Sequence, residues 1–274
     1  MPARPSDPTP APADLLVARS LGPAAGGHTP VVFLHGFAQT GACGGPLVDA
    51  LSDDRPVLLP DLPGHGDPPR HADADLVAAA ALVDATARAA FGDRPVDVVG
   101  YSMGGRIGLV WATAAPGRVR RAVLVGATAG LRSADERAER RTADEVLARG
   151  LEKEGVATFL EQWLALPLFA GLPAWARFED ERRRNTAAGL AASLRHCGTG
   201  TMEPLWDRLG ELPPTLFLAG AEDHRFAALA EGMAEATGAP SRAGTVPGAG
   251  HAAHLERPGE VAALVRAHLD GTDP

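Results

Sequence analysis

Short apolar segments alternate with longer helical ones in the first half of the chain, and this alternation restricts the fold more than any other feature. The β-favouring runs are residues 31–34, 56–59, 96–99 and 122–125. Residues 74–91 are rich in alanine, and Gly92 follows them as a helix stop. Strands that alternate with crossover helices form parallel sheets whose faces helices cover. We therefore predict a mainly parallel, twisted sheet flanked by helices.

The β pattern is interrupted in the second half. Between residues 131 and 206 it gives way to two stretches with amphipathic helical character, SADERAERRTADEVLARGLEKEGVATFLEQWL and WARFEDERRRNTAAGLAASL. Short β-favouring runs return at 215–219 and 241–246, and a helix is expected over 258–269. The predicted organisation is a disordered proline-rich leader (1–13), a core (14–130 and 209–274) and an inserted helical cap (131–208).

A serine lies where one predicted strand turns into a helix. Gly100-Tyr101-Ser102-Met103-Gly104 follows the run VDVV and precedes a helical stretch. The turn needs glycine on both sides of the serine because neighbouring side chains would collide there. The arrangement predicts a nucleophile elbow with an exposed serine hydroxyl, and the alternative is an ordinary glycine-rich turn.

A serine hydroxyl reacts only when a histidine accepts its proton and a carboxylate orients that histidine. After such an elbow the partners follow in the order acid, then histidine. Asp223 comes directly after the apolar run LFLAG, and His251 follows the run that ends at Val246. Both positions are at strand ends, so Ser102, Asp223 and His251 are the predicted catalytic triad.

Other residues compete for these roles. Glu222 is the rival acid, and motif position alone favours Asp223. His254 is three residues beyond His251 and is interpreted as structural. The remaining histidines in loops or polar segments are expected to be solvated or structural: His28, His71, His196, His224 and His268.

Negative charge that develops on a substrate oxygen requires preorganised N–H donors. The backbone amide after the nucleophile belongs to Met103, and a loop after an early strand offers the amide of Phe37. We predict that these two amides form an oxyanion hole, although Phe37 also suits a pocket wall. The glycine-rich turn at 61–66, DLPGHG, is assigned a structural role.

The motifs LHGF, DLPGHG, GYSMGGR and AGHAAHLERP together resemble the α/β-hydrolase superfamily over nearly the whole chain outside the leader. Within it, the chain most resembles the 2-succinyl-6-hydroxy-2,4-cyclohexadiene-1-carboxylate synthases, lyases of menaquinone biosynthesis that eliminate pyruvate from a cyclohexene substrate. The supporting motifs include GYSMGGR, a Trp before PLF, the segment 182–190, GTG at 198–200 and GAEDHRF at 220–226.

The resemblance implies an anionic substrate with three carboxylates, bound by local arginines, and a serine that acts as a base without metal or cofactor. Arg106 lies one helical turn after Ser102, and Arg137 and Arg182 match further carboxylate contacts in the cap. Tyr101 and Trp163 match positions that line the site, although Trp163 also suits ordinary cap packing. A serine hydrolase acting on an ester, thioester or carbon–carbon bond, or a binding protein without turnover, are the alternatives.

Composition sets the remaining expectations. The formal net charge of -8 argues against nucleic acid or an anionic membrane as a partner. The chain has only two cysteines, Cys43 and Cys197, which form neither a disulfide framework nor a zinc-ligand spacing. No run of about eighteen apolar residues occurs, and residues 1–13 lack signal-peptide character. A cytoplasmic location is expected, and protein partners are unknown from the sequence.

Overall fold

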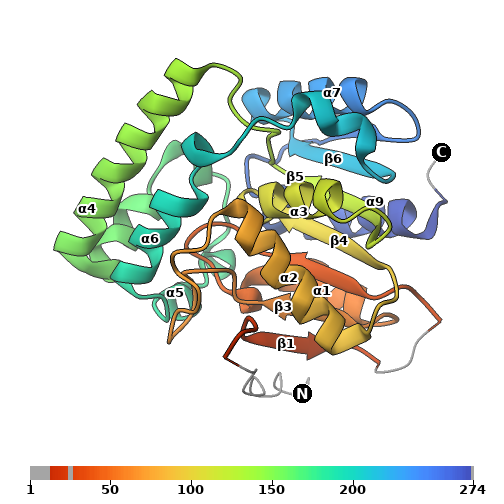
Figure 1. Cartoon of the computed structure of the whole chain (residues 1–274), viewed down its shortest axis with the longest axis horizontal. Coiled ribbons are helices and arrows are strands. Elements are labelled where there is room, and N and C mark those ends of the chain that lie inside the picture. Colours follow the sequence, from red (N-terminus) through yellow and green to blue (C-terminus); the bar gives the residue numbers. More distant parts are fainter. Residues whose placement is uncertain (1–12, 24–26, 273–274) are drawn as a thin grey trace.

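The computed structural model describes residues 13–23 and 27–272, and a seven-stranded sheet forms its centre (Figure 1). The strand order is β1-β3-β2-β4-β5-β6-β7; only β1 is antiparallel to its neighbour. The strands are β1 (Ala18–Leu21), β2 (Val31–Leu34), β3 (Val57–Pro60), β4 (Val96–Tyr101), β5 (Val119–Val125), β6 (Thr215–Gly220) and β7 (Arg242–Val246). The predicted mainly parallel sheet is confirmed.

Helices cover both faces of this sheet, because side chains of a strand point alternately to its two sides. In β2, Val32 and Leu34 join the core cluster under α2 (Leu76–Phe91), α3 (Met103–Ala114) and α7 (His224–Thr237). Val31 and Phe33 join the opposite cluster, under α1 (Gly45–Ser52), α8 (Ala253–Glu256) and α9 (Pro258–Asp270). The predicted helices at 74–91 and 258–269 thus correspond to α2 and α9.

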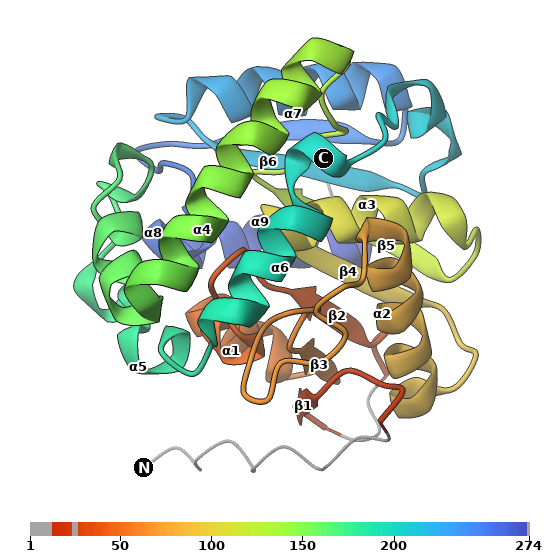
Figure 2. The same ribbon diagram turned by 60° about the vertical axis from the view of Figure 1, so that its left-hand side comes forward.

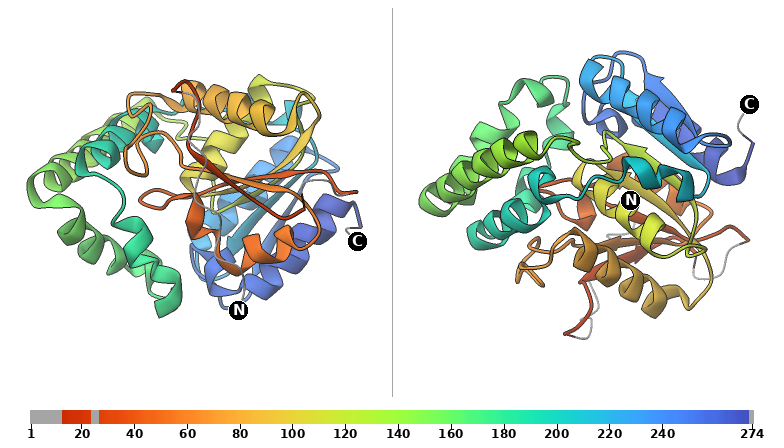
Figure 3. Two further views of the ribbon diagram at one scale, coloured as in Figure 1. Left: turned by 90° about the horizontal axis from the view of Figure 1, so that it is seen from below. Right: turned by 45° about the horizontal axis from the view of Figure 1, so that its top comes forward.

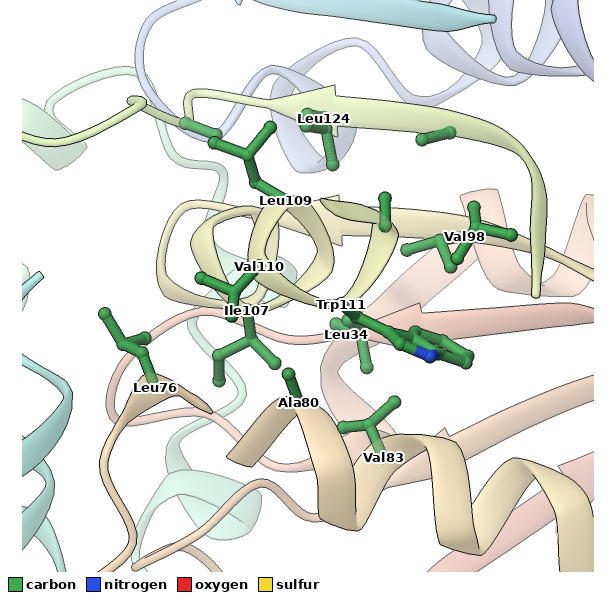
Figure 4. Close-up of a cluster of buried hydrophobic side chains, with 14 of the residues drawn as sticks. Leu34, Leu76, Ala80, Val83, Val98, Ile107, Leu109, Val110, Trp111 and Leu124 are labelled. Carbon is green, nitrogen blue, oxygen red and sulfur yellow. The ribbon is translucent and has the colours of Figure 1, made fainter. Parts of the chain in front are cut away.

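Helix α3 packs beside α2 on the same face of the sheet, as the close-up in Figure 4 shows. Its Ile107 and Trp111 are buried with Leu34 of β2 and with Val83 of α2. Burial of each large apolar side chain contributes about 1.5–3 kcal/mol. Because α3 is packed on two sides, its first residues are held in place beside the carboxyl end of β4.

A helical cap is inserted between β5 and β6. Its helices are α4 (Ala134–Leu164), α5 (Glu179–Arg182) and α6 (Ala187–Cys197), with the short 3-10 turns η2 (Pro167–Phe169), η3 (Ala174–Arg177) and η4 (Thr199–Thr201). Figures 2 and 3 show α4 and α6 side by side, away from the sheet. Ala148 and Leu151 of α4 pack there against Leu190 and Leu194 of α6. Two further turns, η1 (Gly41–Gly44) and η5 (Trp206–Glu211), belong to loops nearer the sheet.

The two amphipathic stretches predicted for the cap form different helical structures. The first forms α4, whose Ser133 and Glu136 make a capping box and whose course is interrupted only at Gly155 (φ 83°). The second is also helical, but it is not continuous: it divides into η3, α5 and α6. Phe178 adopts a left-handed conformation between η3 and α5, and the extended Thr186 caps α6.

The predicted leader, residues 1–13, lies outside the described residues except for Ala13, and the domain boundaries at 130/131 and 208/209 stay predictions. Across residues 13–23 and 27–272, every helix is too short or too polar to cross a bilayer.

Candidate active site

Ser102 occupies a tight turn between β4 and α3. Its backbone has φ 50° and ψ -106°, a conformation that side-chain-bearing residues rarely adopt. A Cβ on Gly100 would lie 2.7 Å from the carbonyl oxygen of Gly104, and one on Gly104 would lie 2.1 Å from that of Leu34. Glycine is therefore required on both sides of the serine, as the sequence pattern predicted.

The side chains of Ser102, His251 and Asp223 form one hydrogen-bonded chain. Ser102 Oγ lies 3.1 Å from His251 Nε2, and Asp223 Oδ2 lies 2.8 Å from His251 Nδ1. The other oxygen, Oδ1, accepts from the amide of Phe226 at 3.3 Å, so Asp223 also caps α7. Burial works to raise the pKa of Asp223, but the hydrogen bond and charge of His251 outweigh it and hold that pKa below its usual value. The carboxylate stays ionised and can orient the imidazole.

Neither rival residue takes part in the hydrogen bonds that link Ser102, His251 and Asp223. Glu222 is exposed, and its amide donates to the carbonyl of Ala249. His254 is fully buried, with its ring 4.4 Å from that of Tyr101, and burial lowers its pKa to about 3. His254 is therefore a neutral core residue, and the hydrogen-bonded set is the one that the sequence predicted.

The loop after β2 is held in shape by side chains. The amide of Gly36 donates to Gln39 Oε1 at 2.8 Å, and the amide of Ala38 donates to His65 Nε2 at 3.2 Å. The amide of Gln39 donates back to the carbonyl of Gly36. Throughout the described ranges, no acceptor is found for the intervening amide of Phe37 or for that of Met103, the first residue of α3. Both residues line the cavity described below, so both amides are available to a ligand oxygen.

Two buried histidines support this loop, and sequence reasoning gave neither a role in the site. His35 Nε2 accepts from the amide of Leu62, while its Nδ1 contacts the carbonyl of Gly36. His65 Nε2 accepts from the amide of Ala38, and its Nδ1 contacts the carbonyl of Pro63. Burial lowers their pKa values to about 4 and about 3. As neutral rings they act as both donor and acceptor, which explains the histidines of LHGF and DLPGHG.

A cavity of about 270 Å³ opens beside Ser102, between the sheet and the cap. Phe37, Tyr101 and Trp163 contribute to its aromatic wall, and the ring of Trp163 lies 5.4 Å from that of Phe37. The indole Nε1 of Trp163 and the side-chain Nε2 of Gln39 are buried without a hydrogen-bond partner among the described residues. The charged residues that line the cavity are Arg106, Arg140, Arg182, Arg225 and Asp223.

Two of these arginines are buried cations without a carboxylate partner among the described residues. Arg106 is 7% exposed, and its Nη1 donates to the carbonyl of Cys197 at 2.6 Å. Arg182 is 2% exposed and donates to the carbonyls of Arg177 and Ala38. Burial lowers the pKa of Arg106 to about 10 and also lowers that of Arg182. A guanidinium in a protein nevertheless stays charged at neutral pH. An anion in the cavity would supply the missing counter-charge.

The structure does not bring Arg137 to the cavity. Its guanidinium donates to the carbonyls of Leu131 and Arg132 at the start of α4. Arg140, almost one helical turn further on, lines the cavity and pairs through Nε with the buried Asp144 at 2.8 Å. We therefore replace Arg137 by Arg140 in the candidate set.

The described residues hold no group of three or more His, Cys, Asp or Glu side chains placed to bind a metal ion. The chemistry that the site can perform with its own groups is proton transfer or acyl transfer at Ser102, next to two free amides and several guanidinium groups.

The fold and this site define the class of protein: the chain belongs to the alpha/beta hydrolase family, whose model matches residues 31–264. It is 35% identical over 218 residues to the 2-succinyl-6-hydroxy-2,4-cyclohexadiene-1-carboxylate synthase of Serratia proteamaculans, covering 78% of this chain and 83% of that one. Within the hydrolase family, the chain belongs with these synthases.

Solved structures agree. MenH from S. aureus superimposes with a TM-score of 0.85 at 29% identity, covering 93% of this chain and 98% of that one. A thermophilic esterase from Thermogutta terrifontis superimposes with a TM-score of 0.80 at 24% identity, covering 94% of each chain, and shows the shared fold alone.

Proposed function

We propose that this protein is a carbon–oxygen lyase that eliminates pyruvate from 2-succinyl-5-enolpyruvyl-6-hydroxy-3-cyclohexene-1-carboxylate to give 2-succinyl-6-hydroxy-2,4-cyclohexadiene-1-carboxylate. The observation that carries this proposal is a cavity in which four arginines and one acid surround the candidate base Ser102. Membership of the synthase family supports the same reaction.

The charge of the cavity fits a substrate with several carboxylates. Asp223 is engaged by His251 and Arg140 by Asp144, so Arg106 and Arg182 remain as uncompensated positive charges. Arg225 lines the cavity as an exposed residue with no counter-ion among the described side chains. This local positive charge contrasts with the net charge of -8 of the whole chain. It therefore selects anions in a protein that is acidic overall.

In the proposed mechanism, His251 Nε2 takes the proton of Ser102, and Asp223 stabilises the imidazolium that forms. The serine oxygen then removes the ring proton next to the succinyl ketone. The electron pair passes to the ketone oxygen, where the amides of Phe37 and Met103 stabilise the enolate. The return of this electron pair to the ring shifts the ring double bond and breaks the ring carbon–oxygen bond. The released enolpyruvate takes a proton on carbon to become pyruvate.

The same triad suits an ester hydrolase, in which Ser102 attacks a carbonyl carbon instead of removing a proton. The 3.1 Å contact between Ser102 and His251 serves either reaction, whereas the arginines of the cavity favour the polycarboxylate lyase.

Cys43 and Cys197 are buried free thiols, which supports the proposed cytoplasmic setting.

The test is pyruvate release from the cyclohexene substrate, corrected for its spontaneous decay. Ser102→Ala should reduce the rate to background. Arg182→Ala should raise KM about 10- to 100-fold because a charged hydrogen bond is lost. Arg183→Ala is the matched control: Arg183 is the next residue, is exposed and is paired weakly with Glu179. No release above background, together with cleavage of p-nitrophenyl acetate that depends on Ser102, would favour the hydrolase instead.

A further inference from the structure

Glu256 binds the two backbone amides on either side of His251. It is the last residue of α8 and is 8% exposed. Its Oε2 accepts from the amide of Gly250 at 2.8 Å, and its Oε1 accepts from the amide of Ala252 at 3.1 Å. One carboxylate oxygen therefore serves each amide, and hydrogen bonds to an ionised acceptor are stronger than neutral ones.

Besides Glu256, the loop that carries His251 is held by backbone hydrogen bonds to the carbonyls of Ala249 and Ala252. It follows β7 as Gly248-Ala249-Gly250, and Gly248 has a φ of 62° that only glycine adopts easily. Asp223 binds the imidazole ring of His251, which fixes the orientation of the ring. This hydrogen bond does not fix the position of the His251 backbone, which other groups must hold. The contacts of Glu256 supply that restraint on both sides of the histidine.

The carboxylate of Glu256 has no cation to neutralise it among the described side chains. The guanidinium of the neighbouring Arg257 donates to the main-chain carbonyl of Glu256, at 3.2 Å, instead of to its carboxylate. The cap covers the other side: a Cβ on Gly171 would lie 2.3 Å from Oε2. A buried carboxylate that lacks a cation is costly to retain, and only the amides around His251 compensate it.

We propose that Glu256 is a positioning residue for His251. It fixes the loop so that Nε2 stays within reach of Ser102 Oγ, and its negative charge favours the imidazolium that forms when His251 takes the serine proton. Glycine at position 171 allows the cap to cover this carboxylate and keep water from it. The proposal rests on the proposed role of His251 as base, and it holds for a lyase and for a hydrolase alike.

The test compares Glu256→Gln with Glu260→Gln. Glutamine keeps the size of Glu256 but replaces one acceptor oxygen by an NH₂ group that faces an amide N–H, and it removes the charge. Glu260 is exposed in the first turn of α9 and serves as the matched control. We expect kcat for pyruvate release to fall on the order of 10- to 100-fold in Glu256→Gln, with KM within about twofold of wild type. Glu260→Gln should match wild type in both.

A second readout does not depend on the substrate. An organic fluorophosphonate reacts with Ser102 only when His251 activates it, so its labelling rate should fall in Glu256→Gln by a factor similar to that for kcat. Glu256→Asp keeps the charge and should retain an intermediate rate, which a loss through misfolding alone would not produce. Labelling of Glu256→Gln at the wild-type rate overturns the proposal. Normal labelling of a wild-type protein that releases no pyruvate would overturn the proposed function and leave this assay of Glu256 intact.

Discussion

At the scale of single residues, Asp223 and Glu222 provide a test of how the acid acts. Asp223 Oδ2 lies 2.8 Å from His251 Nδ1, whereas the neighbouring Glu222 is exposed and contacts the loop only through its amide. Asp223→Asn should lower kcat by about 10⁴-fold, because the amide stabilises the wrong imidazole tautomer and no imidazolium. Glu222→Gln should leave kcat within about twofold of wild type. Steady-state pyruvate release measures both, and a large loss in Glu222→Gln would reassign the acid.

The sequence indicated Ser102, Asp223 and His251 because each follows an apolar strand, and the edge of a parallel sheet brings such positions together. It could not indicate Glu256, because a loop must fold back before its amides reach that carboxylate. Nor could it indicate His65, which accepts from an amide 27 residues earlier in the chain. Arg137 was predicted from its resemblance to a family motif, and a motif does not show the direction in which a cap helix faces. Arg140 replaces it because Arg140 lines the cavity, and the cavity exists only in the folded protein.

At the scale of secondary-structure elements, the close approach of α3 to β2 depends on Gly104. A Cβ there would lie 2.1 Å from the carbonyl oxygen of Leu34 and 2.6 Å from that of His35, and backbone cannot rotate away as a side chain does. Gly104→Ala should lower stability by about 3 kcal/mol or more and Tm on the order of 5–10 °C. Activity should be lost because Ser102 and the Met103 amide move with the helix.

Gly150→Ala is the control for that substitution. Gly150 lies within α4, with nothing within 4 Å of the added Cβ, so alanine should stabilise the helix by about 0.4–1 kcal/mol. Thermal unfolding and pyruvate release check both variants. Equal Tm values for the two alanine variants would show that α3 can shift away from β2 without cost.

Strands β2 and β6 and helix α2 were predictable to within two residues, because their apolar runs are bounded by glycine, proline or aspartate. Strand β1, with the sequence ARSL, was missed since it is a short edge strand with a mixed burial pattern. The break between α5 and α6 was missed as well. There Asn185 accepts from the amide of Gly66 and donates to the carbonyls of Gln39 and Arg182, so contacts with distant loops override a continuous helical pattern.

At the scale of the whole molecule, buried titratable groups determine how stability depends on pH. Burial lowers the pKa of His35 to about 4 and those of His65 and His254 to about 3, from an ordinary value of 6.5. Below pH 6.5 the unfolded chain therefore binds up to three more protons at these sites than the native protein, and stability falls as the pH falls. Asp97 opposes this trend, since burial raises its pKa to about 6 and its native form takes up a proton first.

The net result should be a loss of free energy of unfolding on the order of 3 kcal/mol between pH 7.5 and pH 5.5, from about 1.4 kcal/mol for each of the three histidines less the smaller contribution of Asp97. His254→Leu removes one of the three histidines without touching the hydrogen bonds of His35 and His65, and it should shrink this loss by about 1 kcal/mol. Urea unfolding of both proteins at the two pH values measures the difference, and any constant effect of the substitution on packing cancels in it. If His254→Leu loses as much stability as wild type, His254 is not held neutral in the native protein, and the acid sensitivity arises elsewhere.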